Sequence, residues 1–189
     1  MITAYLTHPD CSLHHMGPEH PESPQRLEAI RARLSLAGLL QQTMQADAKE
    51  ACEEALARVH PLRHLRALEK CLPTEGIVSL DSDTMMNPNS LQAARVAAGA
   101  VIRGVDQVFK RQADNVFCAV RPPGHHAEAS DAMGFCFYNN IAVGAAHAVR
   151  VVVGEVHAHL QQDRDAEAQQ RDREVVAERV VGDRRAERH

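Results

Sequence analysis

Residues 115–126 read NVFCAVRPPGHH, an apolar run that ends at Arg121 and leads into a Pro-Pro-Gly turn with two adjacent histidines. The run predicts a fully buried strand of a parallel sheet, because a strand that is covered on both faces is continuously apolar. The turn that carries His125 and His126 leaves from the carboxyl end of this strand. Open α/β sheets build their ligand sites at that edge, so the sequence places a candidate site at the histidine pair.

The flanking sequence alternates between strand and helix patterns. Residues 2–6 form a short apolar run that is typical of a buried strand, and apolar residues at helical spacing predict several helices. The predicted helices span residues 24–37, 50–58, 61–70, 90–110 and 138–148. Ser23 and Ser90 are the predicted N-caps, and Gly38 is the predicted helix stop. Residues 59–60 and 151–153 are predicted to form short strands. This alternation predicts a layered α/β fold.

The histidine pair indicates proton-transfer chemistry. Two adjacent imidazoles can divide the roles of general base and electrostatic partner near neutral pH. The dipeptide alone would favour an ordinary pair of hydrogen-bonded loop histidines, but its frame favours function. Pro122 and Pro123 stiffen the approach, and Gly124 permits a tight turn. Phe135 follows Gly134 and offers a ring for the wall of a narrow slot, although an isolated aromatic residue more often belongs to a core.

Composition limits the classes of protein to which this chain can belong. The 189 residues with 44% hydrophobic content suit one soluble globular domain, and no apolar run approaches the roughly 18 residues that span a bilayer. The N-terminus lacks the basic segment of a secretory signal, so we expect a cytoplasmic protein. A net charge of −4 argues against a nucleic-acid-binding surface. Five cysteines without a Cys-x-x-Cys pair predict reduced, mostly buried thiols. Neither nucleic acid nor a membrane is therefore expected as a partner.

Two motifs carry a resemblance to a known superfamily. RPPGHHA at residues 121–127, together with GFCFYNNIAV at residues 134–143, resembles the histone deacetylase and acetylpolyamine amidohydrolase superfamily. Upstream segments agree with it, namely residues 20–22, 59–60 and 81–84. The resemblance spans roughly residues 1–150. It implies an arginase/deacetylase-type three-layer α/β fold with a central, mostly parallel sheet.

The resemblance also implies an activity and a set of site residues. The superfamily hydrolyses acetyl-lysine-like amides or acetylated polyamines with a Zn²⁺-bound water, and a histidine pair manages the protons. His125 and His126 match that catalytic pair. Phe135 matches an aromatic residue of the acyl-lysine tunnel, with Gly134 beside it, and Asp83 matches a rim aspartate that holds the substrate backbone. Residues 136 and 139–140 match positions that we interpret as structural.

The metal-binding half of the pattern departs from the superfamily. Its next strand ends in Asp-x-Asp-x-His-His-Gly, where this chain has Val151 to His157. Glu155 and His157 reproduce the Asp-x-His spacing and are the candidate metal ligands. No tyrosine follows Tyr138 to stabilise an oxyanion. A zinc hydrolase needs three protein ligands and an open position, whereas the pattern shows two at most.

The sequence changes character after residue 153. We interpret residues 1–153 as the N-terminal part of a deacetylase-like domain, and residues 154–189 as a polar, charged tail, helical or disordered, that contains no aromatic, proline or lysine residue. A shift of reading frame would explain the change, and a genuine variant is the alternative.

The division of the chain sets the functional prediction. The sequence predicts a truncated and impaired deacetylase-family hydrolase. The alternatives are a non-catalytic acyl-lysine-binding module and an inactive fragment. A sheet without its later strands would expose apolar edges, so the sequence also predicts aggregation or homo-oligomerisation unless a partner covers them.

Overall fold

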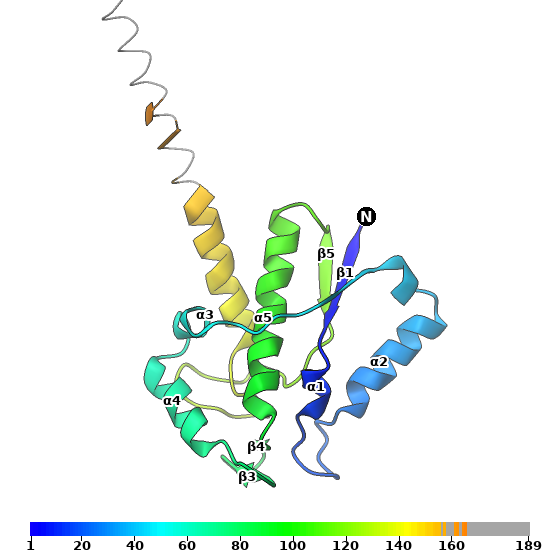
Figure 1. Ribbon diagram of the computed structural model, residues 1–189, viewed down its shortest axis with the longest axis vertical. Coiled ribbons are helices and arrows are strands. Elements are labelled where there is room, and N and C mark those ends of the chain that lie inside the picture. The colour runs from blue at the N-terminus through cyan, green and yellow to red at the C-terminus, as the bar shows by residue number, and fades with distance from the viewer. Residues whose placement is uncertain (156, 158–160, 163, 166–189) are drawn as a thin grey trace, which may run out of the picture. The chain divides into compact units, whose positions relative to one another are not determined.

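The computed structural model describes residues 1–155, 157, 161–162 and 164–165 (Figure 1). The chain divides into two compact units, Met1–Ala148 and Val149–His189. The first unit is built on a three-stranded sheet of order β2-β1-β5, in which β1 pairs in parallel with both neighbours. Its strands are β1 (Thr3–Thr7), β2 (Met44–Asp47) and β5 (Asn115–Cys118). The predicted α/β fold with a parallel sheet is confirmed.

Helices and a small ribbon surround this sheet. The helical elements are α1 (Asp10–Leu13), α2 (Gln25–Leu36), the 3-10 turn η1 (Leu40–Gln42), α3 (Glu53–Ala57), α4 (Leu62–Cys71) and α5 (Ser90–Phe109), and residues 140–155 are also helical. The ribbon pairs β3 (Val78–Ser79) with β4 (Met85–Met86) in antiparallel fashion. No helix of the described residues is both long and apolar enough to cross a membrane.

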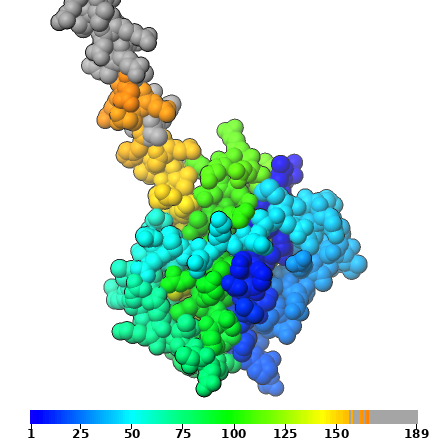
Figure 2. Space-filling model, in the orientation of Figure 1, coloured from blue at the N-terminus to red at the C-terminus, as the bar shows by residue number. Residues whose placement is uncertain are grey.

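α5 is the central helix of the first unit. It contacts β1, β5 and α1, and the space-filling view shows α1 and the segment that leads into α3 lying against it (Figure 2). Its small side chains allow this close approach on several sides. Val96 and Ala100 share a buried cluster with Tyr5 and Leu6 of β1. A second cluster contains side chains from the opposite side of α5 together with residues of α4, β4 and the segment 137–143.

The predicted strand at residues 115–120 is confirmed, but its complete burial is wrong. The β5 side chains alternate between exposed and half-buried, and Phe117 is 45% exposed. Among the described residues, β5 pairs with β1 alone and is therefore an edge strand. A continuous apolar run predicts cover on both faces but cannot show which residues provide that cover.

Other local predictions are also corrected. Residues 151–153 continue the helix that begins at residue 140, and Val152 and Val153 are exposed. Helical hydrogen bonding of the preceding turns thus prevails over the β preference of the valines. Residues 59–60 form a turn, since both of their N–H groups donate to the Leu56 carbonyl. The predicted tail lies mostly outside the described residues.

The predicted helix caps are only partly correct. The N-cap positions of α2 and α5 are Pro24 and Asn89, and neither makes a side-chain capping bond. Ser23 and Ser90 therefore do not cap these helices. Ser90 is the first residue of α5, and its hydroxyl is used in bonds to Asn87. Gly38 does follow the end of α2 with a positive φ of 67°, as its predicted role requires.

Candidate active site

The histidine pair lies on an exposed turn after β5. Both side chains are exposed, and their ring centroids are 4.1 Å apart with the planes inclined at 44°. Gly124 lets the turn pack closely on residues 138–140, because a Cβ atom there would stand 2.5 Å from the Asn140 nitrogen and the Tyr138 carbonyl oxygen. The two imidazoles are therefore neighbours that both reach solvent, an arrangement in which protons can pass between water and either ring.

Gly134 lies against His126, and Phe135 follows it in the chain. Both have positive φ angles, 56° and 70°. A Cβ atom on Gly134 would stand 2.8 Å from Cβ and Cγ of His126, so only a glycine lets this backbone pack on that imidazole. The Phe135 N–H donates to Oγ1 of Thr84 at 3.1 Å. The ring of Phe135 meets His20 edge-on, with centroids 4.7 Å apart and the planes at 82°.

The segment around Asp83 forms the next side of the site. His20 Nε2–H donates to the Asp83 carbonyl oxygen at 3.1 Å, while His20 Nδ1 accepts the Glu22 N–H at 3.1 Å. The Asp81 carboxylate accepts the N–H groups of Asp83 and Thr84 at 2.9 and 2.5 Å. The carboxylate of Asp83 stays exposed and accepts the Thr84 hydroxyl at 3.2 Å. It is free to meet a donor from a bound substrate.

Five predicted site residues precede the tail, and the structure links them in a chain of contacts. They are His125, His126, Gly134, Phe135 and Asp83. His125 neighbours His126, Gly134 packs on His126, and Phe135 binds Thr84 beside Asp83. Sequence reasoning missed His20 and Thr84 as members of the site. Both stand in segments that carried the resemblance, but nothing in their spacing showed that they support Phe135.

The polar residues that we interpreted as structural hold the turn in shape. Asn139 Nδ2 donates to the Ala127 carbonyl oxygen at 3.0 Å, and Asn140 Nδ2 donates to that of Pro122 at 3.3 Å. The buried Cys136 thiol donates to the Gly134 carbonyl oxygen at 3.2 Å, and burial raises its pKa. These contacts connect the two ends of the segment that carries the histidine pair.

Arg121 anchors the start of this segment. Its guanidinium group is fully buried and donates to the carbonyl oxygens of Cys11 and His14 at 2.9 and 2.7 Å. It also binds the buried carboxylate of Glu22 through two nitrogens. Burial alone would raise the pKa of Glu22, but the nearby His14, 3.5 Å away, and the hydrogen bonds from Arg121 outweigh it and lower that pKa to about 2. Burial lowers the pKa of His14.

The candidate metal ligands do not converge. Glu155 and His157 are exposed and stand two positions apart in a helix, where side chains point roughly 200° apart. His157 Nδ1 lies 3.0 Å from the carbonyl oxygen of Val153 in its own helix. Within the described residues, no three His, Cys, Asp or Glu side chains group as metal ligands. This part of the chain therefore does not fit the zinc site that the resemblance implies.

The first unit has a parallel sheet, and the histidine pair lies beyond the carboxyl end of β5. These features define an α/β domain with its candidate site at the carboxyl edge of the sheet. Residues 20–158 match the histone deacetylase domain family. The chain belongs to this family.

Known relatives agree with this assignment. The chain is 40% identical over 124 residues to the histone deacetylase-like amidohydrolase of Pseudomonas aeruginosa, a match that covers 66% of this chain and 32% of that protein. It is 36% identical over 157 residues to the polyamine deacetylase HDAC10 of Homo sapiens, covering 78% and 24%. The crystal structure of the HDA15 HD domain matches with a TM-score of 0.75 and 36% identity, over 79% of this chain and 44% of that one. The chain thus spans a third or less of the two relatives and under half of the solved chain.

We expect Gly134→Ala to displace His126 and to destabilise the fold. The left-handed backbone would cost about 1–2 kcal/mol for a residue with a Cβ atom, and that atom would also clash with the imidazole. Urea unfolding and the His126 ring resonances measure both effects. Gly76→Ala is the matched control, because Gly76 has a φ of 69° but no atom within 4 Å of the added Cβ. Equal losses in the two variants would show that contact with His126 is unimportant.

Proposed function

We propose that this chain carries the proton-handling half of an amide-hydrolysing site for acetyl-lysine or acetylated polyamines. The observation that carries the proposal is the exposed histidine pair with His126 packed against Gly134, while the adjacent Phe135 is held by Thr84 and His20. The deacetylase family membership supports amide hydrolysis as the reaction. The names of the relatives, an amidohydrolase and a polyamine deacetylase, support these two substrate classes.

The proposed roles follow from the chemistry of each side chain. One imidazole accepts a proton from the attacking water, and the other stabilises the charge that develops and returns a proton to the leaving amine. The Phe135 ring packs on the methylene groups of the acylated side chain. The exposed Asp83 carboxylate accepts an N–H from the substrate backbone or attracts the ammonium group of a polyamine. The described residues do not fit a metal site, and these roles belong to side chains alone.

The experiment is a measurement of acetate release from an acetyl-lysine peptide and from acetylspermidine. We expect binding of at least one of them with weak turnover at most, because the described residues carry only the proton-handling half of the site, and the preferred compound identifies the substrate class. The parallel measurement is binding of both compounds by calorimetry. Absence of both turnover and binding would overturn the proposal.

Binding without turnover would support a second function, a non-catalytic acyl-lysine-binding module. The specific observation in its favour is that Phe135 and the Asp83 segment are held by the protein's own contacts. Thr84 fixes the Phe135 backbone, and His20 joins Phe135 to the Asp83 segment. A ligand could therefore be recognised there without any chemical step.

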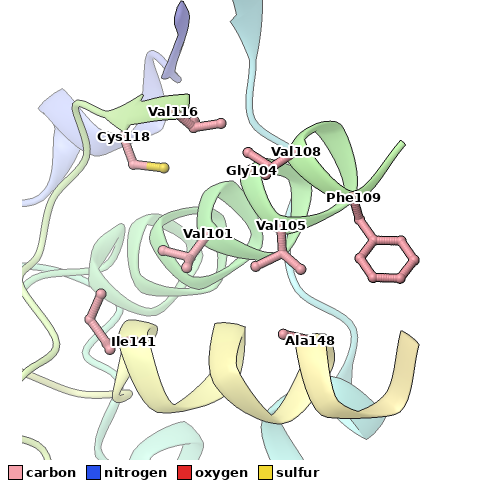
Figure 3. Close-up of a pocket in the computed structure, with 9 residues that line it drawn as sticks. All are labelled: Val101, Gly104, Val105, Val108, Phe109, Val116, Cys118, Ile141 and Ala148. Carbon is pink, nitrogen blue, oxygen red and sulfur yellow. The ribbon is translucent and has the colours of Figure 1, made fainter. Parts of the chain in front are cut away.

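We also propose that the chain self-associates through β5 of a second copy. An open apolar cavity of about 600 Å³ lies between α5, β5 and the helical residues that follow 140 (Figure 3). Val116 and Cys118 of β5 line it together with Val101 of α5 and Ile141, and Ile141 is 65% exposed. An edge strand beside such a surface accepts another strand readily.

Phe117→Lys is expected to reduce this association, because a charged side chain on an edge strand opposes strand pairing. Light scattering across a concentration series measures it. Leu36→Lys is the control, since Leu36 is 81% exposed but belongs to helix α2 and to no strand of the sheet. An unchanged molecular mass in Phe117→Lys, or an equal loss in the control, would contradict pairing through β5.

A further inference from the structure

His60 lies in the turn between α3 and α4 and is fully buried. Its Nδ1–H donates to the Ala129 carbonyl oxygen at 3.1 Å, and its Nε2 accepts the Asn139 N–H at 2.9 Å. Ala129 precedes Gly134 and Phe135 in the chain, and Asn139 follows them. We call these two flanking parts of the segment 129–139 its limbs. A single imidazole thus joins both limbs to a distant part of the chain, 69 and 79 residues away in sequence.

His64 reinforces this connection one helical turn later. It is buried, and its Nε2–H donates to the Phe137 carbonyl oxygen at 3.0 Å. The rings of His60 and His64 stack with centroids 5.0 Å apart and planes at 30°. The Tyr138 ring lies 5.8 Å from His60. The segment 129–139 is therefore held at three backbone groups by two histidines of the α3–α4 region.

The two hydrogen bonds of His60 require one form of the ring. Donation from Nδ1 and acceptance at Nε2 are compatible only with the neutral tautomer that carries its proton on Nδ1. Protonation would place an N–H on Nε2, directly opposite the Asn139 N–H, and that hydrogen bond would be lost. The Ala129 bond would survive, because Nδ1 still donates.

The surroundings favour the neutral form. Burial lowers the pKa of His60, and the nearby His64 lowers it further, whereas the carbonyl groups of Ala129 and Glu128 act in the opposite direction. Among the described residues, the titratable side chains whose rings pack on His60 are those of His64 and Tyr138. Neither is an anion near neutral pH, so neither stabilises an imidazolium.

We propose that His60 is a positioning residue for the candidate site: its neutral ring fastens both limbs of the segment that carries Gly134 and Phe135, and protonation releases the Asn139 limb. That this segment belongs to a substrate site rests on the proposed function. The order of the segment itself is measurable without any substrate. A failure of hydrolysis and a failure of the His60 inference are therefore distinguishable.

The sign of the pH effect follows from the lowered pKa. The unfolded or opened state takes up a proton at the ordinary histidine pKa of 6.5, and the closed state does so only at lower pH. The segment is therefore fully held above pH 6.5 and loosens as the pH falls below that value. Opening should expose the Asn139 amide before the sheet is affected.

The test is amide hydrogen exchange of the wild-type chain, His60→Gln and His60→Leu between pH 5 and 8, expressed as protection factors. Glutamine offers a donor group and an acceptor group but does not titrate, whereas leucine offers neither. In the wild type, protection of Asn139 should fall below pH 6.5 in step with the His60 ring titration, relative to Leu6 of β1. His60→Gln should keep the protection without the pH step, and His60→Leu should lose roughly tenfold or more at every pH.

His147→Gln is the matched control, because His147 is also buried but pairs with Asp106 at 2.7 Å, away from this segment. It should leave the Asn139 pH step intact. The inference is overturned if His60→Gln retains the step, or if the step does not follow the His60 titration. The comparison of wild type with His60→Gln decides the question even if His60→Leu does not fold. Loss of the step in His147→Gln would also overturn it, since the step would then report general destabilisation.

Discussion

Replacing Arg121 with methionine is expected to lower the free energy of unfolding by about 3–5 kcal/mol. The guanidinium group is fully buried and is bound to the Glu22 carboxylate and to two backbone carbonyl groups. Methionine would fill a similar volume but would leave the Glu22 carboxylate buried with the weaker partners His14 and Arg26. Because Arg121 begins the segment that carries the histidine pair, its loss should also disorder the site.

Arg26→Met provides the matched control. Arg26 binds the same carboxylate at 3.1 Å, but its side chain is 44% exposed, so its loss should cost about 1 kcal/mol or less. Chemical denaturation of both variants measures the difference. Similar losses would contradict the claim that burial makes the Arg121 pair decisive. The double variant Glu22→Met, Arg121→Met should recover part of the loss, because no unpaired charge remains.

The same pair predicts a dependence of stability on pH. Because the pKa of Glu22 is lowered from 4.5 to about 2, its contribution is complete above about pH 4.5 and is lost as the pH falls towards 2. Arg121→Met should reduce this acid-side slope along with the stability. An unchanged slope would mean that other carboxylates cause it.

The second large effect is expected on activity. His126→Ala should lower the residual rate of acetyl-lysine hydrolysis in this impaired chain by up to about 10²–10⁴-fold, the range for loss of a general acid or base. The folded state should change little, since the His126 side chain is exposed. The measurement is initial acetate release, with circular dichroism to show that the fold persists.

His15→Ala is its control, because His15 is an exposed histidine outside the 121–140 segment. It should leave the rate within about twofold of the wild type, as surface substitutions remote from a site usually do. A rate for His126→Ala near that of His15→Ala would show that the pair has no part in proton transfer.

The sequence predicted the elements whose signals are local. The apolar run before Arg121 gave the position of β5, and the spacing of small apolar residues gave α5 nearly to the residue. The exposure of Phe117 could not be predicted, because it depends on which strands and helices pack beside β5. The valines at 151–153 misled for a related reason. Their β preference is weaker than the continuity of the helix from residue 140.

The site was predictable as a set of motifs but not as a network. His125, His126, Gly134, Phe135 and Asp83 followed from residues that stand in recognisable patterns. The supports of these residues did not, since His20, His60 and Glu22 act over long sequence separations. A long-range hydrogen bond to a backbone carbonyl leaves no periodic signal in sequence. Such supporting residues can be identified only from the three-dimensional structure.

The most direct test of the central claim, that the 121–140 segment and Asp83 form an acyl-lysine site, is an NMR titration of the labelled chain with an acetyl-lysine peptide. The unacetylated peptide of the same sequence is the control. We predict shifts of the Gly134 and Phe135 amides and of the His125 and His126 rings with the acetylated peptide alone. Shifts confined to other parts of the chain, or equal shifts with both peptides, would contradict the account.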